Sequence, residues 1–141
     1  MQSRLLERRK LPNGLFLEFW DESRKLAGDR WYVAVRAVVP IPLSEHPLER
    51  TPSSVAEFIL REVGDHLCFQ LKEERNFIAE TDVAALREEL KEVFAKNSLS
   101  YLSHPAFPSR FVSQKLREVA EKMGWGEEHL RRLLDGLRRP A

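Results

Sequence analysis

The segment from Trp31 to Val39 restricts the fold more than any other part of the chain. It reads WYVAVRAVV, a run of β-branched and aromatic residues that strongly favours a strand. Successive side chains of a strand point to opposite faces, and here both sets are largely apolar. We therefore expect this strand to belong to a sheet whose two faces both carry large apolar groups.

The first forty residues are expected to form an antiparallel meander. Leu11-Pro12-Asn13-Gly14-Leu15 has the chemistry of a turn, since proline presets the first corner and Asn-Gly accepts left-handed conformations. The run Leu15–Trp20 that follows alternates between two faces. The expected strands are residues 6–11, 15–20 and 30–39.

Two interruptions set the limits of these strands. The polar segment 21–29, which contains Gly28, is interpreted as a loop between the second and third strands. Pro40 and Pro42 are expected to end the third strand, because proline cannot donate a hydrogen bond to the ladder.

Residues 51–141 are predicted to be mainly helical, with one further strand near 66–71. Thr51 and Pro52 have the residue types of a helix start, and Leu67, Phe69 and Leu71 alternate as one face of a strand. The charged residues 72–76 that follow can extend this strand to Phe77 and Ile78. The direction of its pairing stays open, because the connection from Val39 to His66 is long enough for either arrangement.

Three helices are expected in the second half of the chain. Thr81-Asp82 opens an amphipathic helix that frays at Asn97-Ser98, and its apolar stripe contains Val83, Leu86, Leu90, Val93 and Phe94. Residues 101–108 are interpreted as an irregular connection. Ser109 is expected to cap the next helix, and residues 127–137 form a last short one.

The predicted fold class is α+β. The order along the chain is β-β-β-α-β-α-α-α, and strands followed by clustered helices favour a small, mostly antiparallel sheet of about four strands with helices packed on one face. The chain has 141 residues, 43% of them hydrophobic and 32% charged, as expected for one globular domain over residues 1–141.

Charge and cysteine content exclude several kinds of site. The formal net charge is +1, so nothing global favours a polyanionic partner. The single cysteine, Cys68, allows neither an internal disulfide nor a cysteine-based zinc site, and we interpret it as a small apolar residue of a strand.

No signal peptide opens the chain and no run reaches the roughly 18 apolar residues of a membrane helix. A cytoplasmic location without membrane contact is expected.

The sequence carries no catalytic signature. It lacks a Walker loop, a Gly-x-Gly-x-x-Gly motif, a Gly-x-Ser-x-Gly elbow and a His-Glu-x-x-His pair. The four histidines, His46, His66, His104 and His129, are far apart. We expect no cofactor and no metal site, and the lack of catalytic motifs disfavours an enzyme.

One face of the predicted sheet is the first candidate for a functional surface. Glu18 interrupts an apolar strand beside Phe16 and Trp20, and Arg36 interrupts the next beside Tyr32. Glu18 and Arg36 are expected to pair across the strands, because sheets favour opposite charges in register. The face itself either receives cover from the rest of the chain or serves as a dimer interface or ligand platform.

The segment Val119–Leu133 resembles a helix-turn-helix. Ala120 lies where two helices approach closely, and Gly124 follows four residues later to take the turn. Residues 119, 123, 125, 130 and 133 match the small core of that family. The resemblance covers about twenty residues and implies a bent helix pair at about 115–137.

These observations support three hypotheses of function. The leading one is a non-enzymatic protein-interaction module, self-associating or binding a protein partner through its sheet. The alternatives are a nucleic-acid-binding regulator that uses the terminal helices, and a small enzyme whose site is assembled only in the fold, with Glu18, Arg36 and a histidine as its candidates. Nucleic acid is disfavoured because acidic Glu127 and Glu128 open the last helix. The basic residues available to it are Arg131, Arg132, Arg138 and Arg139.

Overall fold

The computed structural model describes residues 3–45 and 52–139. By their contacts these residues form two compact units. Unit 1 contains residues 3–39 and 70–104, and unit 2 contains residues 40–45, 52–69 and 105–139. The single domain remains a prediction.

The fold class is α+β, as predicted, with a small antiparallel sheet and four α-helices among the described residues. Short 3-10 turns at Leu43–Glu45, Glu80–Asp82 and Met123–Trp125 join some of the elements. The strands are β1 (Arg4–Lys10), β2 (Phe16–Asp21), β3 (Arg24–Ala27), β4 (Arg30–Pro42) and β5 (His66–Ala79). The helices are α1 (Ser53–Val63), α2 (Val83–Ser103), α3 (Phe107–Glu121) and α4 (Glu127–Asp135).

Strand β4 is the strand on which the sheet is built. Strands β2 and β3 pair antiparallel with successive segments of it, and β1 pairs antiparallel with β2. In the β2–β4 register Trp20 lies opposite Arg36 and Glu18 opposite Val38. The alternation in the sequence therefore assigned the side chains of β2 and β4 to the correct faces.

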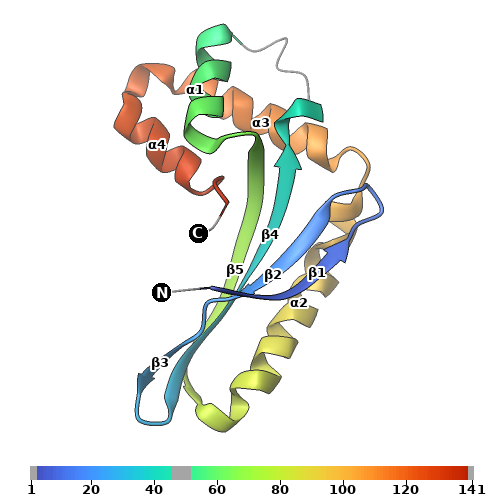
Figure 1. Cartoon of the computed structure of the whole chain (residues 1–141), viewed down its shortest axis with the longest axis vertical. Coiled ribbons are helices and arrows are strands. Elements are labelled where there is room, and N and C mark those ends of the chain that lie inside the picture. The colour runs from blue at the N-terminus through green and yellow to red at the C-terminus, as the bar shows by residue number, and fades with distance from the viewer. Residues whose placement is uncertain (1–2, 46–51, 140–141) are drawn as a thin grey trace. The chain divides into compact units, whose positions relative to one another are not determined.

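Strand β5 also pairs with β4 and runs in the opposite direction (Figure 1). The amide of Leu43 donates to the carbonyl of Asp65 at 2.9 Å at one end, and the amide of Glu80 donates to Asp29 at 2.8 Å at the other. Between these bonds β5 contains one residue more than β4, as a β-bulge requires. Phe77, with φ of 56°, is the only non-glycine residue with positive φ among the described residues.

The segment predicted as a loop at 21–29 contains the extra strand, β3. The amide of Glu22 still donates to Ala34 at 2.9 Å, and the Ser23 hydroxyl accepts from the Ala34 amide at 3.1 Å. The chain therefore continues along β4 after β2 ends. The sequence RKLA has little intrinsic strand preference, so its pairing with β4 determines its conformation.

The prediction that Pro40 ends the third strand is wrong, because β4 continues past it and ends only at Pro42, the second of the two prolines. The amide of Leu43 bonds toward β5, so the nitrogens of the alternate residues 40 and 42 face the other edge of β4. The pairs of β4 with β2 end at Val38. The two prolines therefore interrupt no hydrogen bond of that ladder.

The helix limits also differ from the prediction. Helix α1 begins at Ser53 after Pro52, and the expected cap Thr51 lies outside the described residues. Thr81 and Asp82 belong to a 3-10 turn, and α2 continues past Asn97 to Ser103. Helix α3 starts at Phe107 with Pro108 in its first turn, where a missing amide hydrogen costs nothing, so Ser109 is not its cap.

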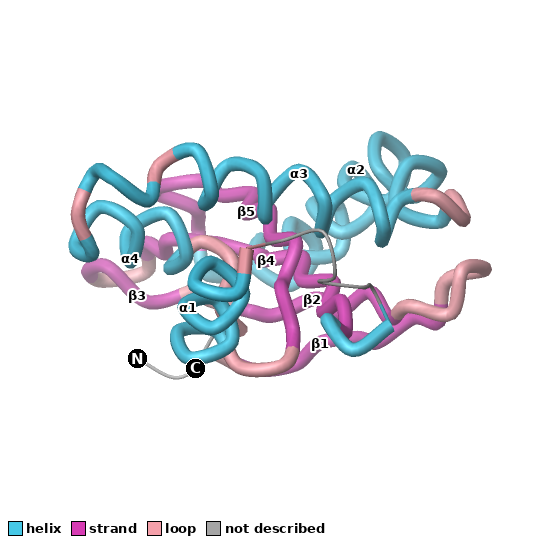
Figure 2. Tube along the Cα trace, turned by 90° about the horizontal axis from the view of Figure 1, so that it is seen from above, coloured by secondary structure: helices cyan, strands magenta, loops and turns pink. Residues whose placement is uncertain are grey.

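The core of unit 1 lies between the sheet and α2, which covers one face of these strands (Figure 2). The rings of Phe19 and Phe94 meet edge to face with centroids 5.7 Å apart. Of the predicted stripe, Val83, Leu90 and Phe94 are buried, whereas Val93 is exposed. At the end of α2, the Asn13 side chain donates to the carbonyls of Leu102 at 2.7 Å and His104 at 3.1 Å, so the predicted turn also caps this helix.

The core of unit 2 is formed by α1, α3, α4 and the ends of β4 and β5. Phe69 of β5 packs against Phe107 and Phe111 of α3, with both centroid distances at 5.9 Å. The predicted free thiol of Cys68 is buried, and its backbone amide donates to Leu137 at 2.8 Å. The buried helix residues include Phe58, Ile59, Val112, Leu116, Leu130 and Leu134.

The segment that resembles a helix-turn-helix forms two helices joined by a 3-10 turn. Gly124 lies inside this turn, and the residue with positive φ is Gly126, at 98°. The core position expected for Trp125 is wrong, because 64% of this residue is exposed. Its ring instead contacts the His129 ring at the surface, with centroids 4.9 Å apart and the ring planes tilted by 44°.

Candidate functional site

The face of the unit 1 sheet opposite Phe19 collects aromatic and charged side chains from several strands. In the β1–β2 and β3–β4 registers, Arg8 lies opposite Glu18 and Arg24 opposite Tyr32. We call this surface the Trp20 face. Its members are Arg8, Phe16, Glu18, Trp20, Glu22, Arg24, Tyr32, Arg36, Gln70, Lys72 and Glu74.

Arg36 is held at this face by three hydrogen bonds. Its Nε and Nη2 atoms donate to the two carboxylate oxygens of Glu22 at 2.7 and 3.0 Å, a bidentate pair, and its Nη1 donates to Gln70 at 3.3 Å. The carboxylate that binds Arg36 is thus that of Glu22, whereas the alternation of side chains along the strands predicted Glu18. Glu22 follows the end of β2, so strand alternation alone did not place it.

Tyr32 of β4 is linked by its side chain to residues of β5. Its hydroxyl donates to Glu74, and the ammonium of Lys72 lies 5.3 Å from the Tyr32 ring centroid. The Tyr32 hydroxyl and the Lys72 ammonium hold the pKa of Glu74 below its usual value. Tyr32, with smaller effects from Glu22 and Glu74, raises the pKa of Lys72. Glu74 and Lys72 are therefore both charged near neutral pH, and their charged atoms lie 3.7 Å apart.

Glu18 is buried, although Phe16 and Trp20 beside it on β2 are partly exposed. The Trp20 indole donates to it at 3.1 Å, and Arg8 Nε lies 3.8 Å from its other oxygen. The Arg8 guanidinium also lies over the Phe16 ring, 3.8 Å from the centroid, and Arg24 lies 5.1 Å from the centroid of Tyr32. Two arginines thus cover aromatic rings of this face.

The structure brings the five predicted site residues together. Phe16, Glu18 and Trp20 come from β2, Tyr32 and Arg36 come from β4, and the contacts above connect them. Sequence reasoning missed the polar residues that complete the face, namely Arg8, Glu22, Arg24, Gln70, Lys72 and Glu74. Three of these residues could have been placed from the sequence. The assignment of residues 67, 69 and 71 to one face of a strand leaves residues 70, 72 and 74 on the opposite face.

Most carboxylates of the Trp20 face are paired with its cations, which limits its chemistry. An acid or base for catalysis needs a proton that it can exchange near the working pH. Here Glu22 binds Arg36, and Glu74 binds Tyr32 and Lys72. What the face offers to a partner is the half-exposed rings of Phe16 and Trp20 and the arginines beside them, which are residue types enriched at protein interfaces, whereas Tyr32 is buried.

The arginines of the second candidate surface, in unit 2, are engaged with carboxylates. Arg131 pairs with Glu62 and Glu127, both at 3.3 Å, and Arg132 pairs with Glu128 at 3.0 Å. Arg138 pairs with Glu62 at 2.8 Å and with Asp135. Of the predicted nucleic-acid contacts, Arg139 is exposed beyond α4. Phosphate would have to compete with carboxylates for the first three.

Two of the histidines are engaged in unit 2. His66 lies 2.8 Å from Asp65, and the His129 ring contacts the Trp125 ring. His46 falls outside the described residues. Over residues 3–45 and 52–139, no three His, Cys, Asp or Glu side chains are grouped as a metal site.

No helix in the described part of the chain is long and apolar enough to cross a membrane.

Comparison of the chain with the models of protein families, with the curated proteins and with the solved structures found no match.

Proposed function

We propose that this protein is a non-enzymatic protein-interaction module and that the Trp20 face is its binding surface. The observation that carries the proposal is that Phe16 and Trp20 lie half-exposed on one sheet face, with the exposed Arg8 over the Phe16 ring and the exposed Arg24 beside the buried Tyr32. Tryptophan and arginine are among the residues enriched at the hot spots of protein interfaces. Their assembly on one sheet face provides an aromatic centre with a charged rim.

Self-association is the form of this function to test first. Homo-oligomers with two-fold symmetry are the commonest assemblies, and they require a surface that complements itself. The Trp20 face exposes both signs of charge, with Arg8, Arg24 and Lys72 beside Glu74. A second copy, turned by a two-fold axis, can oppose unlike charges at the rim and stack aromatic groups at the centre.

The alternatives have weaker support. For a nucleic-acid-binding regulator, the pairing of Arg131, Arg132 and Arg138 with carboxylates counts against binding through α4. For a small enzyme, the bidentate bond of Arg36 to Glu22 counts against a mobile substrate-binding arginine. The cytoplasmic location remains a prediction from the sequence.

Sedimentation velocity over a wide range of protein concentrations tests the proposal. We expect the wild-type protein to pass from monomer to dimer with a dissociation constant of roughly 10 µM. Arg24→Glu changes an exposed rim residue without opening the core, and should weaken association at least about tenfold. Trp20→Ala should do the same by removing the central ring.

Two control variants separate a specific interface from general stickiness. Trp125→Ala removes an exposed tryptophan of unit 2, and Arg110→Glu reverses an exposed arginine of α3. Both should associate like the wild type. A wild type that stays monomeric throughout, or association that Trp125→Ala abolishes and Arg24→Glu leaves intact, would overturn self-association through the Trp20 face.

A further inference from the structure

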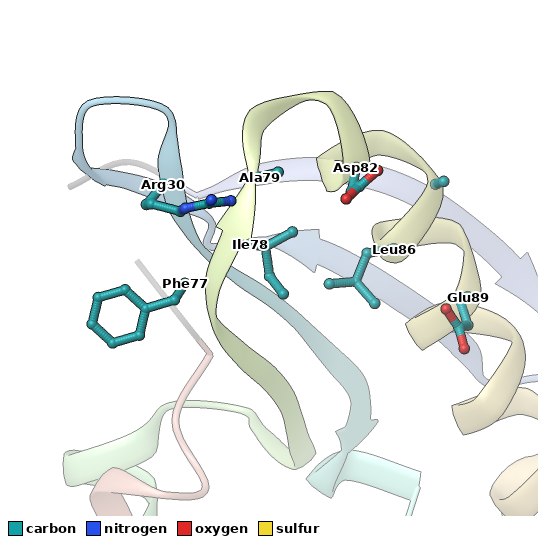
Figure 3. Close-up of a pocket in the computed structure, with 8 residues that line it drawn as sticks. Arg30, Phe77, Ile78, Ala79, Asp82, Leu86 and Glu89 are labelled. Atoms are coloured by element: carbon teal, nitrogen blue, oxygen red, sulfur yellow. The ribbon is translucent and has the colours of Figure 1, made fainter.

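Unit 1 has a pocket of about 470 Å³ between the end of β5 and the start of α2. Ile78 of β5 and Leu86 of α2 point toward one another across it, whereas Phe77 points away to the other side of β5 (Figure 3). Ala79 and Ala85 also line it. The volume lies within the range of small-molecule sites, and the two aliphatic side chains supply an apolar slot.

Charged groups stand at both ends of this slot. Arg30 and Asp82 lie on either side of Ala79, and Glu89 lies further along α2 (Figure 3). Asp82 and Glu89 are separated by about two helical turns, roughly 10 Å along the axis. The pocket therefore has one cation and one carboxylate at its β5 end and a second carboxylate beyond the apolar slot.

These charges are available to a ligand. Within residues 3–45 and 52–139, neither Asp82 nor Glu89 has an ion-pair partner, and both residues are exposed. Arg30 has one weak pair, with Asp29 at 3.9 Å between exposed side chains. An exposed pair of this kind contributes little and is easily exchanged. This distinguishes the pocket from the Trp20 face, most of whose carboxylates are paired with its cations.

We propose that this pocket binds a free basic amino acid with an unbranched side chain, of which lysine is the simplest. Arg30 receives the α-carboxylate and Asp82 the α-ammonium group. The methylene chain lies on Ile78 and Leu86, and Glu89 receives the terminal ammonium group. Each polar group of the ligand thus meets an opposite charge, and its apolar part meets the apolar slot.

The order of the groups decides between ligand classes. A simple diamine would leave Arg30 facing a cation, and an aliphatic amino acid would leave Glu89 without a partner. A fatty acid would place its chain correctly but would bring no cation to Asp82. Lysine is matched at all four positions, because its terminal nitrogen is separated from the α-carbon by four methylenes.

Titration with lysine and three analogues tests this assignment. Norleucine lacks the terminal ammonium group, cadaverine lacks the carboxylate, and 6-aminohexanoate lacks the α-ammonium group. Trp31 reports binding by its fluorescence, since its indole donates to Glu80 at 3.3 Å in the turn next to the pocket. We expect lysine to bind with a dissociation constant of roughly 1 mM in this open site. Each analogue should bind at least about tenfold more weakly.

Variants assign each group of the ligand to its residue. Glu89→Gln should reduce the affinity for lysine about tenfold and leave that for norleucine unchanged. Arg30→Ala should lower the affinity for lysine to that for cadaverine. All these residues are exposed, so the fold should persist, which circular dichroism checks.

A matched pair of α2 variants tests the location. Ala85→Phe fills the slot and should abolish lysine binding, whereas Ala84→Phe makes the same change at an exposed neighbour outside the pocket and should preserve it. Absence of lysine binding at tens of millimolar would overturn the proposal. Equal binding of lysine and norleucine, or equal effects of the two phenylalanine variants, would also overturn it.

Discussion

Among single residues, Phe77 has the least favourable backbone. A left-handed conformation costs a residue with a bulky side chain about 1–2 kcal/mol, and 74% of Phe77 is exposed, so burial offsets little of this cost. Asparagine adopts this conformation more readily. We expect Phe77→Asn to raise the free energy of unfolding by about 0.5–1 kcal/mol in urea denaturation. A loss of stability would mean that the ring makes contacts that its exposure does not indicate.

Two carboxylates of unit 1 link stability to pH. A hydrogen bond from Arg9 holds the pKa of Glu7 below its usual value against the effect of burial, and Lys91, 2.9 Å away, adds to this. Burial by itself raises the pKa of Asp21, but hydrogen bonds from Ser23 and Arg87 outweigh it and lower the pKa. Since both folded-state values are depressed, the stabilisation is present above the unfolded-state pKa values, near 4.

This stabilisation should therefore disappear as the pH falls from about 5 toward 2. We expect Glu7→Gln to flatten the dependence of unfolding free energy on pH over this range, measured by urea denaturation. Glu57→Gln is the control, because Glu57 is exposed and has no ion-pair partner among the described residues. Equal slopes for both variants would refute the link.

At the scale of elements, the turn before β2 stabilises the end of α2. Asn13 donates to two carbonyls there, and its side-chain oxygen accepts from the Leu15 amide at 3.2 Å. Asn13→Asp keeps the acceptor, removes the donors and places a negative charge at a helix C-terminus. It should lower the free energy of unfolding by about 1–2 kcal/mol. Asn76→Asp, the same change on exposed β5, should have less than half this effect in the same denaturation assay.

Elements with local signals could be predicted from the sequence. The alternation in β2 and β4 depends on side-chain chemistry alone, so it gave the strands and the face shared by Trp20 and Tyr32. The strand β3 and the continuation of β4 past Pro40 to Pro42 depend on neighbouring strands, and no local pattern in the sequence predicts them. The sequence likewise contains no signal for the positive φ of Phe77.

The residues of the candidate sites could likewise be predicted where the signal is local, but not where it depends on contacts between distant parts of the chain. The aromatic members of the Trp20 face were predicted, whereas Glu22 and Lys72 were not recognised as partners, because they are distant in sequence and meet only in the sheet. The pocket combines Arg30 with Asp82 and Glu89, and nothing in the sequence connects residues so far apart. Trp125 matched a core position of a motif, yet the 3-10 turn leaves it at the surface.

The paired arginines of α4 lead to a prediction about nucleic acid. We expect no salt-sensitive binding of labelled duplex DNA in fluorescence anisotropy, because a phosphate at Arg131 or Arg132 would also meet the negative charges of Glu127 and Glu128 beside them. Binding that weakens steeply with salt and is lost in Arg131→Gln/Arg132→Gln would contradict this interpretation. Arg110→Gln/Arg117→Gln on α3 is the matched control, because these two exposed arginines have no side-chain partner in the described part of the chain.

At the scale of the whole molecule, the proposed function requires that the Trp20 face meets a protein partner, beginning with a second copy. The three tryptophans report on separate surfaces. Trp20 belongs to the sheet face, Trp31 bonds to Glu80 beside the pocket, and Trp125 lies exposed in unit 2. Their indole N–H groups give three distinct signals in one ¹H–¹⁵N spectrum.

A dilution series of that spectrum is the most direct test. We predict that the Trp20 indole signal shifts with protein concentration, because a partner ring changes its environment, while the Trp125 signal stays fixed. The shift should vanish in Arg24→Glu. If the Trp125 signal moves and the Trp20 signal does not, or if no signal moves up to millimolar concentration, self-association through the Trp20 face is wrong.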